Sequence, residues 1–142
     1  MSRQETQDRW DAIYREHRTV GEADPFVTAS EFLPLPSARA VDLAGGTGGT
    51  ALWLAANGYE VSLVEISQTA IEVAKREAAR QQLKLSTIHH DLESSAQLAD
   101  SWNIAVCCNF LDRSLYSILH NYVAPKGMLF VKVATITNLE RH

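Results

Sequence analysis

The sequence predicts an α/β fold: a doubly wound, Rossmann-like, mostly parallel sheet with strand order 3-2-1-4-5 and helices on both faces. Short apolar runs alternate with amphipathic stretches from residue 38 onward, which is the pattern of successive β-α-β units. A glycine-rich turn follows the first apolar run, as is typical of a tight strand-to-helix connection. The 142 residues, of which 46% are hydrophobic, suffice for one core and are few for two. We therefore expect a single domain, residues 1–142.

Residues 1–37 are expected to form a helical lead-in to the sheet. An amphipathic helix is predicted over residues 4–18, since four large side chains recur at helical spacing between charged ones: Trp10, Ile13, Tyr14 and His17. Prolines at positions 25, 34 and 36 interrupt any longer element. Only a short helix fits between them, within residues 27–33.

The α/β core, residues 38–142, begins with a strand, a helix and a second strand. Residues 39–44 form a short apolar run that suits a parallel strand buried on both faces. Residues 48–57 are predicted to be helical and to end at Gly58, because glycine readily adopts the left-handed backbone that follows a helix. Residues 59–65 are the second strand.

The same alternation continues to the end of the core. Ser67 is the expected N-cap of the next helix, because its hydroxyl can accept from a first-turn amide. The remaining elements are predicted in this order: helix 68–82, strand 84–89, strand 103–108, helix 112–123 that Asp112 can cap, turn 125–127 and strand 128–134.

The loop Gly45–Gly49 lies where such sheets bind ligands, beyond the carboxyl end of the first strand. Glycines let a ligand approach the backbone, and amides at the start of the following helix can donate to it. Glu65 ends the second strand about twenty residues further on, at the position that accepts both ribose hydroxyls. The pattern therefore predicts a ligand that contains a nucleoside.

Two classes of such ligand remain open from the loop alone. Residues 46–51 satisfy the dinucleotide fingerprint with alanine in its last place, so an NAD-dependent oxidoreductase is one reading. Asp42 precedes the glycines, where a carboxylate would repel a pyrophosphate but attract an ammonium group. No GxxxxGK[ST] pattern occurs, which excludes a nucleoside-triphosphate loop.

Four motifs resemble those of the class I S-adenosylmethionine-dependent methyltransferases, in the small-molecule and tellurite-resistance-like branch. Residues 42–48, DLAGGTG, resemble the acid-x-Gly-x-Gly-x-Gly loop of the family, with Ala44 in place of the first glycine. Residues 64–67, VEIS, resemble the acidic ribose-binding end of strand two, and residues 90–92, HDL, the adenine-binding segment. Residues 109–113, NFLDR, resemble the stretch that lines the methionine end.

The resemblance implies S-adenosyl-L-methionine as the cofactor. The residues that it assigns to cofactor binding are Asp42, Ala44, Gly45, Gly46, Thr47, Gly48, Glu65, Ile66, Asp91, Leu92, Asn109 and Phe110. It also implies that the N-terminal helix, with RWDAIYREH and the following DPF, folds over the cofactor as a lid. Trp10, Tyr14 and Phe26 are then candidates to cover the cofactor or to shape the acceptor pocket, although aromatic residues on one helix face also suit a core.

The expected activity is transfer of a methyl group to a small-molecule acceptor by in-line displacement. Positioning and exclusion of water can supply much of the rate enhancement, so a dedicated base is optional. If the acceptor must lose a proton, the candidates are His17, His120, Tyr14 and Asp112, and for each a structural or surface role competes. No catalytic residue is assigned.

The chain departs from the family after its fifth predicted strand, since it ends at His142 before the usual helix and C-terminal β-hairpin. Three readings are open: a fragment, a truncated relative, or two copies that form a homodimer through the edge of that strand. The cofactor motifs all precede the break. An alternative function is therefore a non-catalytic S-adenosylmethionine-binding module that associates through its exposed fifth strand.

Composition narrows the remaining function classes. A formal net charge of −4 and a pI near 5.7 argue against nucleic acid as a partner. We expect no membrane association and a cytoplasmic location, because the sequence has no apolar run long enough to span a bilayer and no apolar signal segment at its start. We predict no metal site, and we expect the neighbours Cys107 and Cys108 to face opposite sides of a strand as free thiols.

Overall fold

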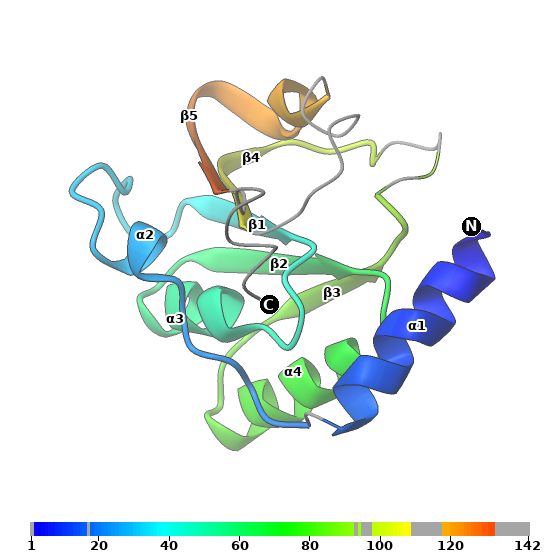
Figure 1. Ribbon diagram of the computed structural model, residues 1–142. Coiled ribbons are helices and arrows are strands. Elements are labelled where there is room, and N and C mark those ends of the chain that lie inside the picture. Colours follow the sequence, from blue (N-terminus) through cyan, green and yellow to red (C-terminus); the bar gives the residue numbers. More distant parts are fainter. Residues whose placement is uncertain (1, 17, 93, 95–97, 109–117, 133–142) are drawn as a thin grey trace.

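The structure, a computed structural model, describes residues 2–16, 18–92, 94, 98–108 and 118–132. These residues form one five-stranded sheet with strand order β3-β2-β1-β4-β5 (Figure 1). Every strand pairing within the described residues is parallel. The strands are β1 Arg39–Leu43, β2 Glu60–Glu65, β3 Ser86–His89, β4 Trp102–Cys108 and β5 Val123–Lys132. The predicted fold class and strand order are confirmed.

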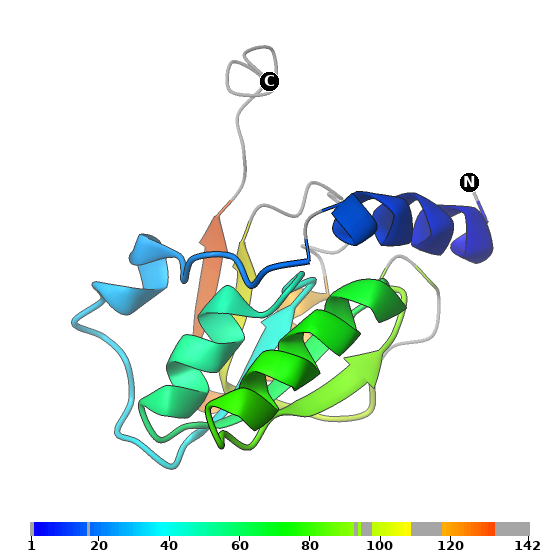
Figure 2. The ribbon, with the colours of Figure 1, turned by 90° about the horizontal axis from the view of Figure 1, so that it is seen from below.

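The helices of the described residues flank this sheet. They are α1 Arg3–Glu16, α2 Pro25–Thr28, α3 Gly49–Ala56, α4 Gln68–Arg80 and the 3-10 helix η1 Leu119–Tyr122. Figure 2 shows α3 and α4 side by side on one face of the sheet. The buried residues of η1 pack on the opposite face. Of the predicted helix 112–123, residues 112–117 lie outside the described residues, and residues 119–122 form the 3-10 turn.

The sheet is buried on both faces, as parallel sheets are when elements cover each side. Along β1, Ala40 packs with the helices α3 and α4, whereas Val41 and Leu43 pack with η1. Cys107 and Cys108 likewise belong to opposite faces, and both are free thiols. The prediction for the two cysteines is confirmed.

Two helix boundaries follow directly from local chemistry. The Ser67 hydroxyl accepts a hydrogen bond from the Ala70 amide at 3.1 Å, which caps α4 as predicted. Gly58 follows the C-cap of α3 with φ +94°, a left-handed backbone that suits glycine. Both helices therefore begin and end within two residues of their predicted bounds.

The predicted turn at residues 125–127 lies inside β5 rather than before it. Trp102 pairs with Val123 and Ile104 with Met128, so residues 124–127 bulge opposite the single residue Asn103. Lys126, at the centre of the bulge, has φ +66°. Pro125, Lys126 and Gly127 thus form a bulge within one strand instead of a turn that precedes it.

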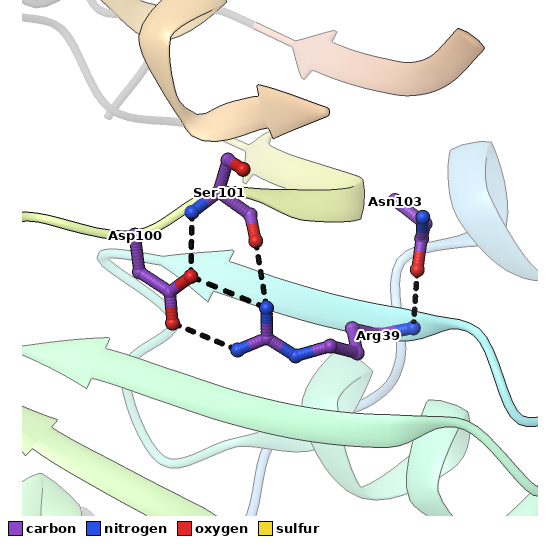
Figure 3. Close-up of polar contacts among 4 residues, drawn as sticks. All are labelled: Arg39, Asp100, Ser101 and Asn103. Atoms are coloured by element: carbon purple, nitrogen blue, oxygen red, sulfur yellow. Dashed lines mark hydrogen bonds and ion pairs between the residues drawn. The ribbon is translucent and has the colours of Figure 1, made fainter. Parts of the chain in front are cut away.

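A polar clasp joins the starts of β1 and β4, at the end of the sheet away from the glycine loop. Figure 3 shows the Arg39 guanidinium donating to both carboxylate oxygens of Asp100, at 3.2 and 2.8 Å, and to the Ser101 carbonyl at 2.9 Å. The Arg39 amide donates to Asn103 Oδ1 at 2.8 Å. Because the Arg39 and Asp100 side chains are each about half exposed, we expect the ion pair to contribute little to stability.

Candidate cofactor site

A cavity of about 380 Å³ lies beyond the carboxyl ends of the central strands. Its wall combines the loops that follow β1 and β2, residues 90–92 after β3, and Cys108 at the end of β4. Side chains of α1 and of residues 21–24 complete it. Parallel sheets bring these distant segments together at one edge, which is where such sheets bind ligands.

The glycine loop lines this cavity, and two of the residues there adopt a left-handed backbone conformation. Ala44 and Gly46 have φ values of +57° and +61°. The left-handed backbone at Gly46 favours glycine, and a Cβ atom there would also lie 2.9 Å from the Tyr14 hydroxyl oxygen of α1. Gly45, Gly46 and Thr47 all line the cavity.

Asp42 lies under the loop and is 4% exposed, with its side chain on the cavity wall. Burial raises the pKa of Asp42 to about 7, and the negative charges of Glu65 and Asp24 add to this rise. A hydrogen bond from the Ala51 amide opposes it. A cation bound in the cavity would favour the ionised form of this carboxyl group.

Glu65 ends β2 and is held by backbone amides on either side. Its Oε1 accepts from the Gly46 amide at 3.0 Å and its Oε2 from the Ser67 amide at 2.7 Å. Burial raises the pKa of Glu65, while these hydrogen bonds favour the charged form. The carboxylate is thus fixed between the glycine loop and the start of α4, on the cavity wall.

Residues after β2 and β3 supply an apolar part of the wall. Ile66 and Leu92 line the cavity beside Asp91, which is 8% exposed. The preceding His90 also lines it, and its Nε2 atom is buried without a hydrogen-bond partner among the described residues. Apolar side chains beside a carboxylate and an imidazole suit a flat, partly polar ring such as a nucleobase.

Helix α1 forms one side of the cavity although none of its residues is buried. Trp10 and Tyr14 stack with ring centroids 6.0 Å apart, and both line the cavity. Asp11 attaches the helix to the start of α4, because its Oδ1 accepts from the Ser67 hydroxyl at 2.5 Å and from the Thr69 amide at 3.1 Å. Burial acts to raise the pKa of Asp11, but these hydrogen bonds outweigh it and the pKa is lowered.

Residues 18–24, which we call the strap, connect α1 to α2 and cross the glycine loop. The Gly21 amide donates to Thr47 Oγ1 and the Asp24 amide to Thr50 Oγ1, each at 3.0 Å. The Asp24 carboxylate caps α2 and pairs with Lys132 of β5 at 3.2 Å. Three of the strap residues, Gly21, Glu22 and Asp24, line the cavity.

The structure brings most of the predicted cofactor residues to this cavity. Those that line it are Asp42, Ala44, Gly45, Gly46, Thr47, Glu65, Ile66, Asp91 and Leu92. Gly48 does not line it; with φ +88° it is the N-cap of α3 and its amide donates to the Gly45 carbonyl. Asn109 and Phe110 lie outside the described residues.

Among the aromatic lid candidates, Trp10 and Tyr14 reach the cavity, whereas Phe26 packs edge-on against Phe130. Sequence reasoning gave no part in the site to the further wall residues Thr6, Gly21, Glu22 and Cys108. The other wall residues lie within motifs that the sequence analysis quoted: Asp24, Gly49, Thr50 and His90. The strap carries no recognisable pattern, since its position depends on hydrogen bonds to threonines more than twenty residues away.

None of the helices in the described ranges is long and apolar enough to cross a membrane. Within the same ranges, no group of three or more His, Cys, Asp or Glu side chains is arranged to hold a metal ion.

The comparison with family models identifies the class of protein that this fold and cavity define. A methyltransferase domain model matches residues 40–127, more than half of the chain, and the chain belongs to that family. S-adenosylmethionine is the cofactor of the family, and a structurally similar protein from Geobacter sulfurreducens was solved with S-adenosyl-L-homocysteine. The comparison with curated proteins finds no match.

Solved structures share the fold at low sequence identity. The chain is 24% identical to the protein solved in a study of the conversion of a disulfide bond into a thioacetal group during echinomycin biosynthesis, with a TM-score of 0.70 over 82% of this chain and 57% of that one. TehB from Haemophilus influenzae is 20% identical to the chain, with a TM-score of 0.68 over 85% of this chain and 44% of that one. The Geobacter sulfurreducens methyltransferase is 22% identical to the chain, with a TM-score of 0.67 over 83% of this chain and 51% of that one. The chain therefore spans about half the length of these proteins.

The residues present fit S-adenosylmethionine. The cavity offers buried carboxylates for ribose hydroxyls and for an ammonium group, and apolar side chains for a nucleobase. The glycine loop leaves backbone exposed at its floor. Its lining includes no Lys or Arg among the described residues, as suits a ligand that carries positive charge rather than phosphate.

Proposed function

We propose that this chain binds S-adenosylmethionine in the described cavity and transfers its methyl group to a small-molecule acceptor. The observation that carries the proposal is the convergence of Asp42, Glu65 and Asp91, from three different strand ends, on one cavity that includes the glycine loop. Membership of the methyltransferase domain family supports it and argues against the NAD-dependent alternative.

In this proposal the protein acts by holding and enclosing the reactants. When bound, the cofactor supplies a methyl group on a sulfonium, which is already activated toward nucleophiles. Glu65, fixed by two backbone amides, orients the nucleoside, and Asp42 faces the amino-acid part. Trp10 and Tyr14 of α1 limit water on the open side of the cavity.

No residue described in the structure is proposed as a general base. Burial and the charge of Glu65 raise the pKa of Tyr14 to about 12, so its hydroxyl stays protonated near neutral pH and serves as a hydrogen-bond donor. His120 is exposed on η1 and does not line the cavity. The other candidates, His17 and Asp112, lie outside the described residues. Positioning alone is therefore the proposed source of catalysis.

The acceptor class is proposed as a small molecule on the strength of the resemblance and the acidic wall of the site. TehB and the protein from the echinomycin study are similar in fold only, so neither identifies the acceptor. The wall acids argue against a polyanionic acceptor, because like charges repel in a partly buried site. A cytoplasmic location stays part of this proposal.

Calorimetric titration with S-adenosylmethionine, S-adenosylhomocysteine and NAD tests the proposal directly. We expect heat with both sulfur compounds and none with NAD. Glu65→Gln, which keeps one acceptor oxygen for the Gly46 or Ser67 amide, should lose at least about tenfold in cofactor affinity, because a hydrogen bond to a charged group contributes about 1.5 to 3 kcal/mol. Arg39→Lys, at the far end of the sheet, is the control.

Binding without turnover favours the second candidate, a non-catalytic cofactor-binding module. A radioactive methyl-transfer assay over a panel of small thiols, amines and phenols separates the two functions. Binding of NAD alone would refute both.

A further inference from the structure

The wall of the cavity carries an excess of negative charge. Five of its described residues are acids and none is a lysine or arginine: Glu22, Asp24, Asp42, Glu65 and Asp91. Lys132 pairs with Asp24 at 3.2 Å and does not itself line the cavity. Such a wall favours a bound cation over a neutral molecule of the same shape.

Two of these acids are not explained by the cofactor motifs. Asp42, Glu65 and Asp91 occupy positions expected to bind the cofactor, whereas Glu22 and Asp24 belong to the strap. The strap is fixed over the glycine loop by the hydroxyls of Thr47 and Thr50, each at 3.0 Å from a strap amide. The strap backbone is therefore fixed at the cavity by the amides of Gly21 and Asp24, on either side of Glu22.

The two strap acids differ in how much of their charge is available. The Asp24 carboxylate accepts from the Phe26 amide at 2.9 Å and pairs with Lys132 at 3.2 Å. Glu22 is exposed and lines the same cavity, and its side chain has no hydrogen bond or ion pair among the described residues. Glu22 thus presents the less compensated negative charge.

The cofactor and its product differ by one positive charge. When the acceptor lone pair forms its bond to the methyl carbon, the C–S bonding pair stays on sulfur, and the sulfonium becomes a neutral thioether. The nucleoside and amino-acid parts are unchanged. A residue that binds those parts affects both molecules alike, whereas a nearby fixed charge affects mainly the cation.

We propose that the strap acids, chiefly Glu22, make this site bind the sulfonium cofactor more tightly than its demethylated product. The strap would then be a specificity element that promotes release of the product after methyl transfer. This inference rests on the proposed function for the identity of the ligand, and it adds a role for residues outside every cofactor motif.

Titration calorimetry of the whole chain with S-adenosylmethionine and with S-adenosylhomocysteine tests the inference. We expect Glu22→Gln to lower the affinity for S-adenosylmethionine about three- to fivefold and to leave the affinity for S-adenosylhomocysteine unchanged. An effect of this size is expected for one charge several ångströms away in a partly solvated site. Asp24→Asn, in which asparagine can still cap α2, should have a smaller effect in the same direction. Glu31→Gln removes an exposed acid outside the cavity and is the matched control.

The outcomes separate the two proposals. If the wild-type chain binds neither sulfur compound, the proposed function fails and the inference fails with it. If the wild type binds both and Glu22→Gln changes their affinities equally or not at all, the inference alone is wrong. The wild-type preference for the cofactor over its product should also shrink when NaCl is raised from about 0.02 M to about 0.3 M. A decrease as large as the one that Glu22→Gln causes at low salt would support the inference.

Discussion

Ala44 is strained at the position where the family motif has glycine. Its backbone adopts φ +57°, a left-handed conformation that costs an L-residue with a Cβ atom about 1 kcal/mol or more. We predict that Ala44→Gly raises the free energy of unfolding by about 1 kcal/mol, measured by urea denaturation. Ala55→Gly within α3 is the control and should lower it by about the same amount. Equal effects of the two substitutions would contradict the strain.

Asp42 links stability to pH. Its pKa is raised from 3.8 to about 7, so between these values the folded protein holds a proton that the unfolded chain has lost. The contribution of Asp42 to the free energy of unfolding therefore falls as the pH rises from about 4 to about 7. The buried carboxylate is a cost to the empty fold that a bound cation would offset.

The variant Asp42→Asn separates these two effects. At pH 8 we expect the free energy of unfolding of this variant to be about 2 to 4 kcal/mol higher than that of the wild type. Near pH 3, where both side chains are neutral, we expect no difference. Cofactor affinity should fall at least about tenfold, since the charge partner of the amino group is lost. Denaturation at both pH values, with and without the cofactor, measures both effects. Lower stability at pH 8 would refute the assignment.

At the scale of elements, α1 depends on polar contacts for its attachment to α4. It has no buried residue, and Asp11 joins it to Ser67 and Thr69 at the start of α4. We predict that Asp11→Ala increases amide hydrogen exchange in α1 by about tenfold or more, because hydrogen bonds to a carboxylate contribute about 1.5 to 3 kcal/mol. The exchange of α4 beyond its first turn should be unchanged.

The matched control for α1 is Asp8→Ala on the same helix. Asp8 accepts a hydrogen bond from the exposed Gln4 side chain of the same helix at 2.8 Å, and its loss should leave α1 protected. Adding the cofactor should slow exchange in α1 if the helix is a lid, as proposed from the resemblance. Unchanged exchange with cofactor in the wild type would argue that α1 is only a fixed wall.

The strap depends on glycine at one point of the loop. A Cβ atom on Gly49 would overlap the Gly21 carbonyl oxygen, although the Gly49 backbone itself is helical. Gly49→Ala should therefore displace the strap without disturbing α3. We expect a loss of the preference for the cationic cofactor over its product, together with faster exchange of the Gly21 and Asp24 amides, which hydrogen exchange detected by NMR would resolve. An unchanged preference would separate the strap from ligand selection.

For the whole molecule, β5 is an edge strand of the described sheet. Leu129 on this strand is 37% exposed, and an uncovered edge can pair with a second copy. We propose a homodimer through this edge, and light scattering during size-exclusion chromatography measures it. Leu129→Lys should then give a monomer, because a charge at an edge strand opposes pairing. A wild-type monomer at all concentrations would refute the dimer.

Much of the fold is predictable because its signals are local. The caps at Ser67 and Gly58 and the alternation of apolar runs each depend on a few neighbouring residues. The bulge in β5 is different: its turn residues predict a break, but whether the chain leaves the sheet depends on the pairing with β4. Gly48 likewise matches the cofactor motif, yet its place behind the loop follows from the start of α3.

The sequence alone determined the parallel fold and the identity of the strand-end acids, because these follow from periodicity and from residues at fixed spacing. The choice of S-adenosylmethionine over a dinucleotide was implied by the resemblance of four motifs to the methyltransferase family. Only the tertiary structure decided which segments complete the cavity: α1 through Asp11, and the strap through Thr47 and Thr50. It also decided the charge state of Asp42, since burial and the approach of Glu65 and Asp24 are set by packing between segments far apart in the chain. Contacts of that kind leave no pattern along the sequence.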